Sequence, residues 1–100
     1  MRTPWRQRTE MPGGMLSFPN PSRAYDATRR AVRFWGHDHA MEASFFVTED
    51  ALRRVAPGLA ADEAGFLAAF DAHRDAIVAA AVKVYTRGRK GSYDVLAADL

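Results

Sequence analysis

Two neighbouring runs of β-branched and aromatic residues constrain the fold of this 100-residue chain more than any other feature. They span residues 30–35 and 41–48, and residues 36–40, which begin with a glycine, separate them. Runs of this composition joined by a short glycine-containing segment are typical of a β-hairpin. The sequence therefore predicts two antiparallel strands connected by a five-residue loop.

Side chains alternate between the two faces of a strand, so each residue of the hairpin can be assigned to a face. The face expected to meet the core carries Val32, Phe34, Met41, Ala43, Phe45 and Val47. The opposite face carries Arg33, Trp35, Glu42, Ser44 and Phe46. This second face is thus polar at some positions and strongly aromatic at others.

Two helices are expected after the hairpin. Thr48 is suited to cap a short helix that ends before the Pro-Gly pair at residues 57–58. Asp62 is suited to cap a second helix, in which apolar residues recur at helical spacing until Gly88. The second helix is predicted to be continuous and about six turns long.

Two shorter strands complete the pattern. Residues 15–18 are expected to form the first, which the proline-containing turn at 19–22 ends, and a further turn is expected at 26–29. Residues 93–98 are expected to form the closing strand. The order β-β-β-α-α-β groups strands and helices, which predicts an α+β fold: an antiparallel sheet of three to four strands with two helices packed on one face.

The positive charge of the chain is unevenly distributed. Residues 1–14 carry three arginines and one glutamate, contain two prolines and a Gly-Gly pair, and show no periodicity. They are predicted to form a flexible N-terminal arm, and residues 15–100 a single domain. Because the domain has equal numbers of basic and acidic side chains, the net charge of +2 belongs to the arm.

Composition excludes several classes of function. The chain has no cysteine, which excludes disulfides, thiol catalysis and thiolate metal sites and fits a reducing compartment. No apolar run approaches the roughly 18 residues that span a bilayer, and residues 1–15 lack the apolar core of a signal peptide. We therefore expect a cytoplasmic protein that does not contact a membrane.

The side chains that could carry chemistry are few and scattered. His37, Asp38 and His39 form the one cluster of metal-ligand types, but no fixed third or fourth ligand accompanies them, which favours a solvated turn. His73 lacks a partner at the spacing of helical metal motifs, and no serine has the context of a nucleophile. The sequence therefore predicts no catalytic residue, no metal, no cofactor and no enzyme.

Several short segments, taken together, resemble a known family. They are residues 18–22, 25–26, 31–34, 45–47 with 50–52, and Phe70 with Arg74 and Ile77. Over about residues 15–98 the chain is similar to the small bacterial proteins of domain-of-unknown-function family 1488. The resemblance implies a stand-alone compact α+β protein without an established activity, and it carries over no functional residue. The helical spacing of Asp71 and Arg74 allows an ion pair on the helix surface. The resemblance hints that Arg74 also ties the helix to a neighbouring loop.

The uncovered face of the sheet gives the leading functional hypothesis. If helices cover one face, the large apolar groups on the other face need a different cover; they are Trp35, Phe46 and Leu96. The cover can come from the chain itself, through Leu16, Phe18, Trp5 or the loop around Tyr25. It can equally be a second copy, forming a homodimer, or another protein. The hypothesis is a non-enzymatic protein–protein interaction or accessory module.

A group of basic residues supports an alternative. Its members follow one another without an intervening acid at the end of the long helix: Lys83, Arg87, Arg89 and Lys90. They can complement the negative end of the helix dipole, or contact phosphates together with the arginines of the arm. Aromatic residues such as Trp35 or Tyr93 could then stack on bases. The alternative is a small nucleic-acid-binding regulator that uses this basic turn and the arm.

Overall fold

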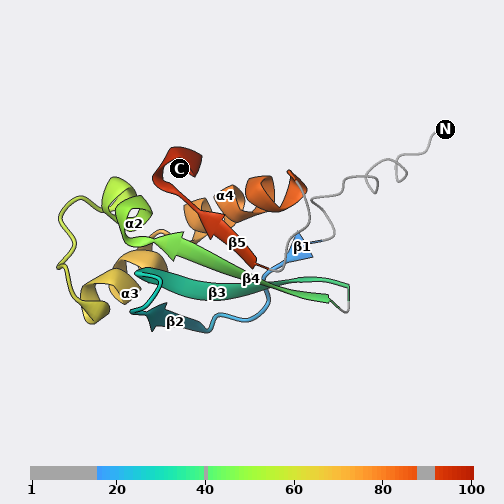
Figure 1. Ribbon diagram of the computed structural model, residues 1–100, viewed down its shortest axis with the longest axis horizontal. Helices are drawn as coiled ribbons and strands as arrows, with labels where there is room; N and C mark the ends of the chain where they lie inside the picture. Colours follow the sequence, from blue (N-terminus) through green and yellow to red (C-terminus); the bar gives the residue numbers. More distant parts are fainter. Residues whose placement is uncertain (1–15, 40, 88–91) are drawn as a thin grey trace.

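The computed structural model describes residues 16–39, 41–87 and 92–100. The arm predicted at residues 1–14 lies outside these ranges, as do Arg89 and Lys90 of the basic turn. The described residues confirm the α+β fold, with helices packed on a mostly antiparallel sheet (Figure 1).

In the described part of the chain, five strands form one sheet. In chain order they are β1 (Leu16–Ser17), β2 (Arg23–Asp26), β3 (Ala31–Asp38), β4 (Met41–Thr48) and β5 (Ser92–Val95). β3 pairs antiparallel with β1, β2 and β4, whereas β5 pairs parallel with β4. The parallel pair differs from the all-antiparallel prediction, and it arises because the helices carry the chain back along the sheet between β4 and β5. β2 was not predicted.

The hairpin of β3 and β4 confirms the two central strands but not their connection. The pairing continues through Gly36 with Ala43 and His37 with Glu42 to Asp38 with Met41, so the five-residue loop prediction was wrong. The glycine was misleading because Gly36 serves packing here. A Cβ at this position would lie 2.8 Å from the Phe18 ring, so only glycine leaves room for that ring.

The two predicted helix starts are confirmed. α2 (Glu49–Val55) begins where the Thr48 hydroxyl accepts a hydrogen bond from the Ala51 amide at 3.1 Å. α3 (Glu63–Ala72) begins where the Asp62 carboxylate accepts one from the Gly65 amide at 2.7 Å. Each side chain satisfies a backbone N–H group that has no partner inside its helix.

The long second helix was predicted wrongly. The chain leaves helical geometry at His73 (φ −118°, ψ 23°) and then starts α4 (Arg74–Thr86). The break changes the direction of the chain, so that α3 packs against β2 and β3 while α4 packs against β5. The apolar spacing continues across the break, which is why periodicity did not reveal it.

The core lies between the helices and one face of the sheet. Its largest fully buried side chains include Phe34, Phe45 and Phe70, and the residues assigned to this face are buried with the exception of Met41. Met41 is 65% exposed, because it lies at the start of β4, before Ser44–Val47, the residues that pair with β5. No described helix is long and apolar enough to cross a membrane.

Candidate interaction face

The face of the sheet that points away from the core is the candidate site, and we call it the open sheet face. It is formed by Arg29, Arg33, Trp35, Ser44, Phe46 and Asp94. Arg33, Trp35, Ser44 and Phe46 alternate with buried core residues along β3 and β4, as the sequence predicts. Arg29 comes from the turn between β2 and β3, and Asp94 comes from β5.

An arginine of the same chain covers the Phe46 ring. The guanidinium carbon of Arg29 lies 3.9 Å from the centroid of that ring, and the Phe46 residue is only 6% exposed. A guanidinium nitrogen of Arg29 lies 3.6 Å from a carboxylate oxygen of Asp94, which holds the guanidinium over the sheet. Cation–π attraction and this ion pair therefore cover an apolar group that would otherwise meet water.

Arg33 lies between the two aromatic rings. Its guanidinium carbon is 5.1 Å from the Trp35 ring centroid and 5.6 Å from that of Phe46. The same guanidinium donates a hydrogen bond to the Ser44 hydroxyl at 3.0 Å. The structure thus brings Trp35 and Phe46 into one layer with two arginines, and Trp35 stays half-buried.

Leu96 lies apart from this layer. It follows the last paired residues, Val47 and Val95, and is 49% exposed. It lines a hollow together with Val84 and Arg87, which belong to the end of α4. Of the three residues assigned to the interaction face, Leu96 is therefore at the edge of the sheet, near the helix side.

The segments expected to cover the open sheet face from within the chain lie mainly on the other side. The Phe18 ring is 5.9 Å from that of Phe34 and 5.5 Å from that of Phe45, within the core. Leu16 belongs to the same core cluster. Tyr25 stacks on Phe66 of α3 at 5.8 Å. Trp5 lies outside the described residues.

The described part of the basic patch is already partly neutralised. Lys83 is exposed on the last turns of α4, whereas Arg87 forms an ion pair with Asp99 at 3.1 Å. Asp99 belongs to η2 (Ala97–Asp99), a short 3₁₀ helix where the sequence predicted the closing strand to continue. Asp99 follows the basic residues in the sequence, so the run of basic residues did not reveal this partner of Arg87.

The histidine cluster is spread along the end of the hairpin. His37 lies on β3 with its Nε2 atom 3.9 Å from Glu42, while Asp38 accepts a hydrogen bond from the Tyr85 hydroxyl at 2.6 Å. His39 follows in left-handed backbone geometry (φ 58°). Among the described residues, no group of three or more His, Cys, Asp or Glu side chains is placed to hold a metal ion.

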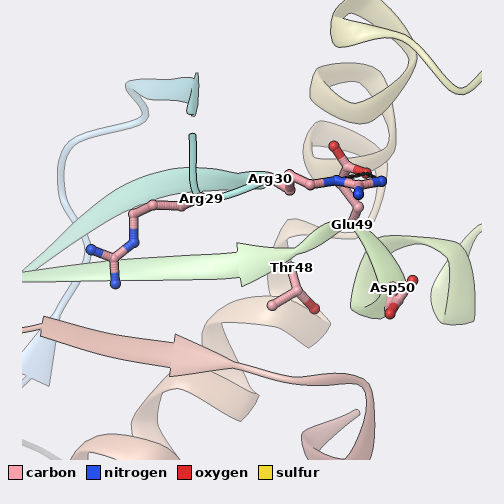
Figure 2. Close-up of a pocket in the computed structure, with 5 residues that line it drawn as sticks. All are labelled: Arg29, Arg30, Thr48, Glu49 and Asp50. Carbon is pink, nitrogen blue, oxygen red and sulfur yellow. Dashed lines mark hydrogen bonds and ion pairs between the residues drawn. The ribbon is translucent and has the colours of Figure 1, made fainter. Parts of the chain in front are cut away.

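Glu49, an acid in the first turn of α2, carries a buried carboxylate that several polar groups contact. The Glu49 side chain is 8% exposed, and its carboxylate accepts hydrogen bonds from the Tyr25 hydroxyl at 2.5 Å and from Arg30 at 3.2 Å. The bond from Tyr25 and then the positive charge of Arg30 lower the pKa of Glu49. Figure 2 shows the Arg30 guanidinium beside Glu49 and the Arg29 guanidinium pointing away from it. The two guanidinium groups therefore do not lie together in the hollow that both residues line.

Two further polar contacts connect the helices to β2 and the segment before it. Arg74 donates a hydrogen bond to the backbone carbonyl of Asn20 at 3.1 Å, so the tie to a neighbouring loop is confirmed. Asp71 instead forms a pair of hydrogen bonds with Arg23, at 2.8 and 2.9 Å. The helix-surface pair of Asp71 with Arg74 is replaced by this longer-range pair.

Comparisons with known proteins agree with this fold. A family model described as "Protein of unknown function (DUF1488)" matches residues 16–96. A crystal structure of a protein of unknown function from the same family, from Shewanella loihica PV-4, is similar, with a TM-score of 0.72 and 18% identity. The similarity covers 81% of this chain and 91% of that chain, and at this identity it shows the fold alone. No curated protein matches the chain.

Proposed function

We propose, from the premise that this chain belongs to the DUF1488 family of proteins of unknown function, that it is a non-enzymatic protein–protein interaction module. The open sheet face is the proposed binding surface, and a second copy of the chain is the proposed partner. The observation that carries the proposal is the layer of Trp35, Phe46, Arg29 and Arg33 on a sheet face opposite the helices.

The residue types of this layer support a protein partner. Tryptophan and arginine are enriched among the residues that contribute most to protein–protein binding. Here Ser44 and Asp94 hold the two guanidinium groups in place, which reduces the conformational entropy that binding would cost. A partner that covers Trp35 would also remove its remaining apolar surface from water.

The balance of charge supports a second copy as that partner. Arg29 and Arg33 supply two positive charges, while Asp94 and the neighbouring Glu42 supply two negative charges with exposed side chains. A face of this kind carries no large field of one sign that would repel an identical face. In a two-fold interface both copies use the same patch, so a contact between two different residues occurs twice, once in each direction.

Light scattering during size-exclusion chromatography tests the proposal. We expect the wild type to show twice its chain mass of 11.1 kDa and to dissociate on dilution. Trp35→Ser should remain a folded monomer. Met41→Ser is the matched control, because it also removes an exposed apolar side chain but at the far end of the hairpin, outside the open sheet face. A wild type that is monomeric at every concentration, or a Trp35→Ser dimer, would contradict the proposal.

The nucleic-acid alternative, which the sequence places on the basic turn and the arm, is supported by one further observation: the half-buried Trp35 ring lies beside the Arg33 guanidinium on the open sheet face. Base stacking and basic side chains are the means by which single strands are commonly bound. A labelled single-stranded oligonucleotide at low salt tests this alternative. Binding that weakens steeply with added salt, and on replacing Arg87, Arg89 and Lys90, would support it. Absence of binding at low salt would remove it.

A further inference from the structure

The side chains of the open sheet face lie in rows that cross the strands, because residues paired directly across neighbouring strands point to the same face. The first row consists of Arg33, Phe46 and Asp94, with the Arg29 guanidinium on the Phe46 ring. The second row consists of Trp35, Ser44 and Ser92. The same alternation continues the face into a third row, which consists of His37 and Glu42. Neighbouring rows are two residues apart along β3, which is about 6.6 Å.

The first and third rows carry opposite charge. The first row, together with Arg29, holds the guanidinium groups of Arg29 and Arg33 and the carboxylate of Asp94. The third row holds the carboxylate of Glu42, whose side chain is 55% exposed. Its ion-pair partner among the described residues is His37, at 3.9 Å, and an imidazole carries little positive charge at about pH 8. The face is therefore positive at one end and negative at the other.

The charges at the positive end exceed those that the same chain neutralises. The nearest atoms of Arg29 and Asp94 are 3.6 Å apart, beyond ordinary hydrogen-bond distance, and their side chains are 44% and 57% exposed. Arg33 donates a hydrogen bond to the uncharged Ser44 hydroxyl. One carboxylate thus faces two guanidinium groups in this row. A further carboxylate from a partner would balance the second positive charge.

A two-fold axis in the plane between two such faces can bring the rows together in two ways that keep the strands aligned. An axis along the strands sets each row against the same row of the partner, so four guanidinium groups would gather at one end. An axis across the strands at the second row exchanges the ends, so the positive row of each copy faces the negative row of the other. Because opposite charges favour association and like charges oppose it, the charge pattern selects the axis across the strands.

We propose that Glu42 determines how two copies of this chain pack, an inference that rests on the proposed self-association. Glu42 of each copy meets the partner's Arg29, because Glu42 and the ring under Arg29, that of Phe46, are equally far from Ser44 along β4. Trp35 of each copy lies at the axis, where the two indole rings cover each other from water. Each contact between Glu42 and Arg29 occurs twice in the dimer. Glu42 therefore selects a second copy in one orientation.

Reversal of the charge at Glu42 tests this contact. Glu42→Arg should raise the dissociation constant of the dimer by about tenfold or more, because two attractive contacts become repulsive. Glu63→Arg is the matched control: it makes the same change of charge on an exposed side chain of α3, which covers the other face of the sheet, and should leave the constant unchanged. Analytical ultracentrifugation at about pH 8 measures both. A Glu42→Arg dimer as tight as the wild type overturns the proposal.

A mixture of two charge-reversed variants tests the pairing itself. Arg29→Glu changes the other member of the contact and should also weaken self-association. In an equal mixture of Arg29→Glu and Glu42→Arg, one contact of the heterodimer keeps its native charges and the other has both charges reversed. The heterodimer should therefore exceed its share in a random mixture, which native mass spectrometry measures because the variants differ in mass. A random distribution overturns the proposal, and Glu42→Arg alone stays decisive if Arg29→Glu does not fold.

The other axis predicts the opposite response to Arg29→Glu. With the axis along the strands, guanidinium groups lie opposite one another, so Arg29→Glu would tighten the dimer, and that result would overturn the proposal. A wild type that stays monomeric would overturn the proposed self-association as well. A dimer that Trp35→Ser dissociates and Glu42→Arg does not would leave the proposed function standing and refute this orientation alone.

Discussion

Among the residues that the structure describes, Glu49 is the one buried charged residue, although its sequence position indicates only a favourable place at the start of a helix. The carboxylate joins β2, through Tyr25, to the turn before β3, through Arg30. It also lies 3.7 Å from Arg53 of its own helix. A buried acid with these partners fixes the junction between β4 and α2 to the edge of the sheet.

Glu49→Gln should lower the free energy of unfolding by about 1–3 kcal/mol, because charged hydrogen bonds become neutral ones in a buried place. Asp50→Asn makes the same chemical change next to it, on a side chain that is 86% exposed, and should have little effect. Urea unfolding at neutral pH compares the two. Equal losses would show that Glu49 is not a specific junction.

The same carboxylate predicts a dependence of stability on pH. The pKa of Glu49 is lowered from its usual 4.5 by the bond from Tyr25, and that of Asp71 from 3.8 by the bond from Arg23. Because the unfolded chain binds these protons more tightly, both contributions are present above the usual values and are lost as pH falls through the lowered ones. We expect the unfolding free energy, measured from about pH 6 downward, to fall less steeply in Glu49→Gln than in the wild type. An unchanged slope would contradict this assignment.

Local signals account for most of the elements that could be predicted. Thr48 and Asp62 predict the starts of α2 and α3, because a capping side chain accepts a hydrogen bond from an amide only three residues away. The end of α3 has no such signal. His73 interrupts the helices where Arg74 reaches the Asn20 carbonyl, a contact 54 residues away in the sequence. The charged and short β2 is likewise held by distant partners rather than by strand propensity.

The start of α3 gives a prediction at the scale of the element. A Cβ at Gly65 would lie 1.9 Å from the Ala60 carbonyl oxygen, so Gly65→Ala requires the backbone to move. Alanine favours a helix over glycine by about 1 kcal/mol, but here we expect a net loss of about 1–3 kcal/mol. Gly58→Ala is the control, since no atom lies within 4 Å of its added Cβ. Urea unfolding of both variants measures the difference, and a stabilised Gly65→Ala would refute the close approach.

At the scale of the whole molecule, the alternation of the hairpin was sufficient to place Trp35 and Phe46 on one face. It could not show that Arg29 covers Phe46, because that contact depends on the turn before β3 and on Asp94 of a distant strand. Nor could it place Leu96, which follows the end of β5 at the sheet edge. The single apolar surface expected from sequence is thus divided into an aromatic–arginine layer and a separate edge.

This division gives the open sheet face and the hollow at the edge of β5 different chemistry. The open sheet face offers flat aromatic and guanidinium groups, which suit a second copy of the same face. The hollow beside β5 is lined by apolar and by charged groups, namely Val84, Leu96, Arg87, Asp94 and Asp99. Asp94 borders both surfaces, because it lines the hollow and pairs with Arg29 on the open sheet face.

The fluorescence of Trp35 tests self-association through the open sheet face most directly. Trp5→Phe leaves Trp35 as the one tryptophan of the chain. As the protein concentration rises through the transition from monomer to dimer, its emission should shift to shorter wavelength and quenching by acrylamide should weaken, because the partner excludes water from the ring. Emission and quenching that stay constant while a dimer forms would show that the chain associates through a different surface.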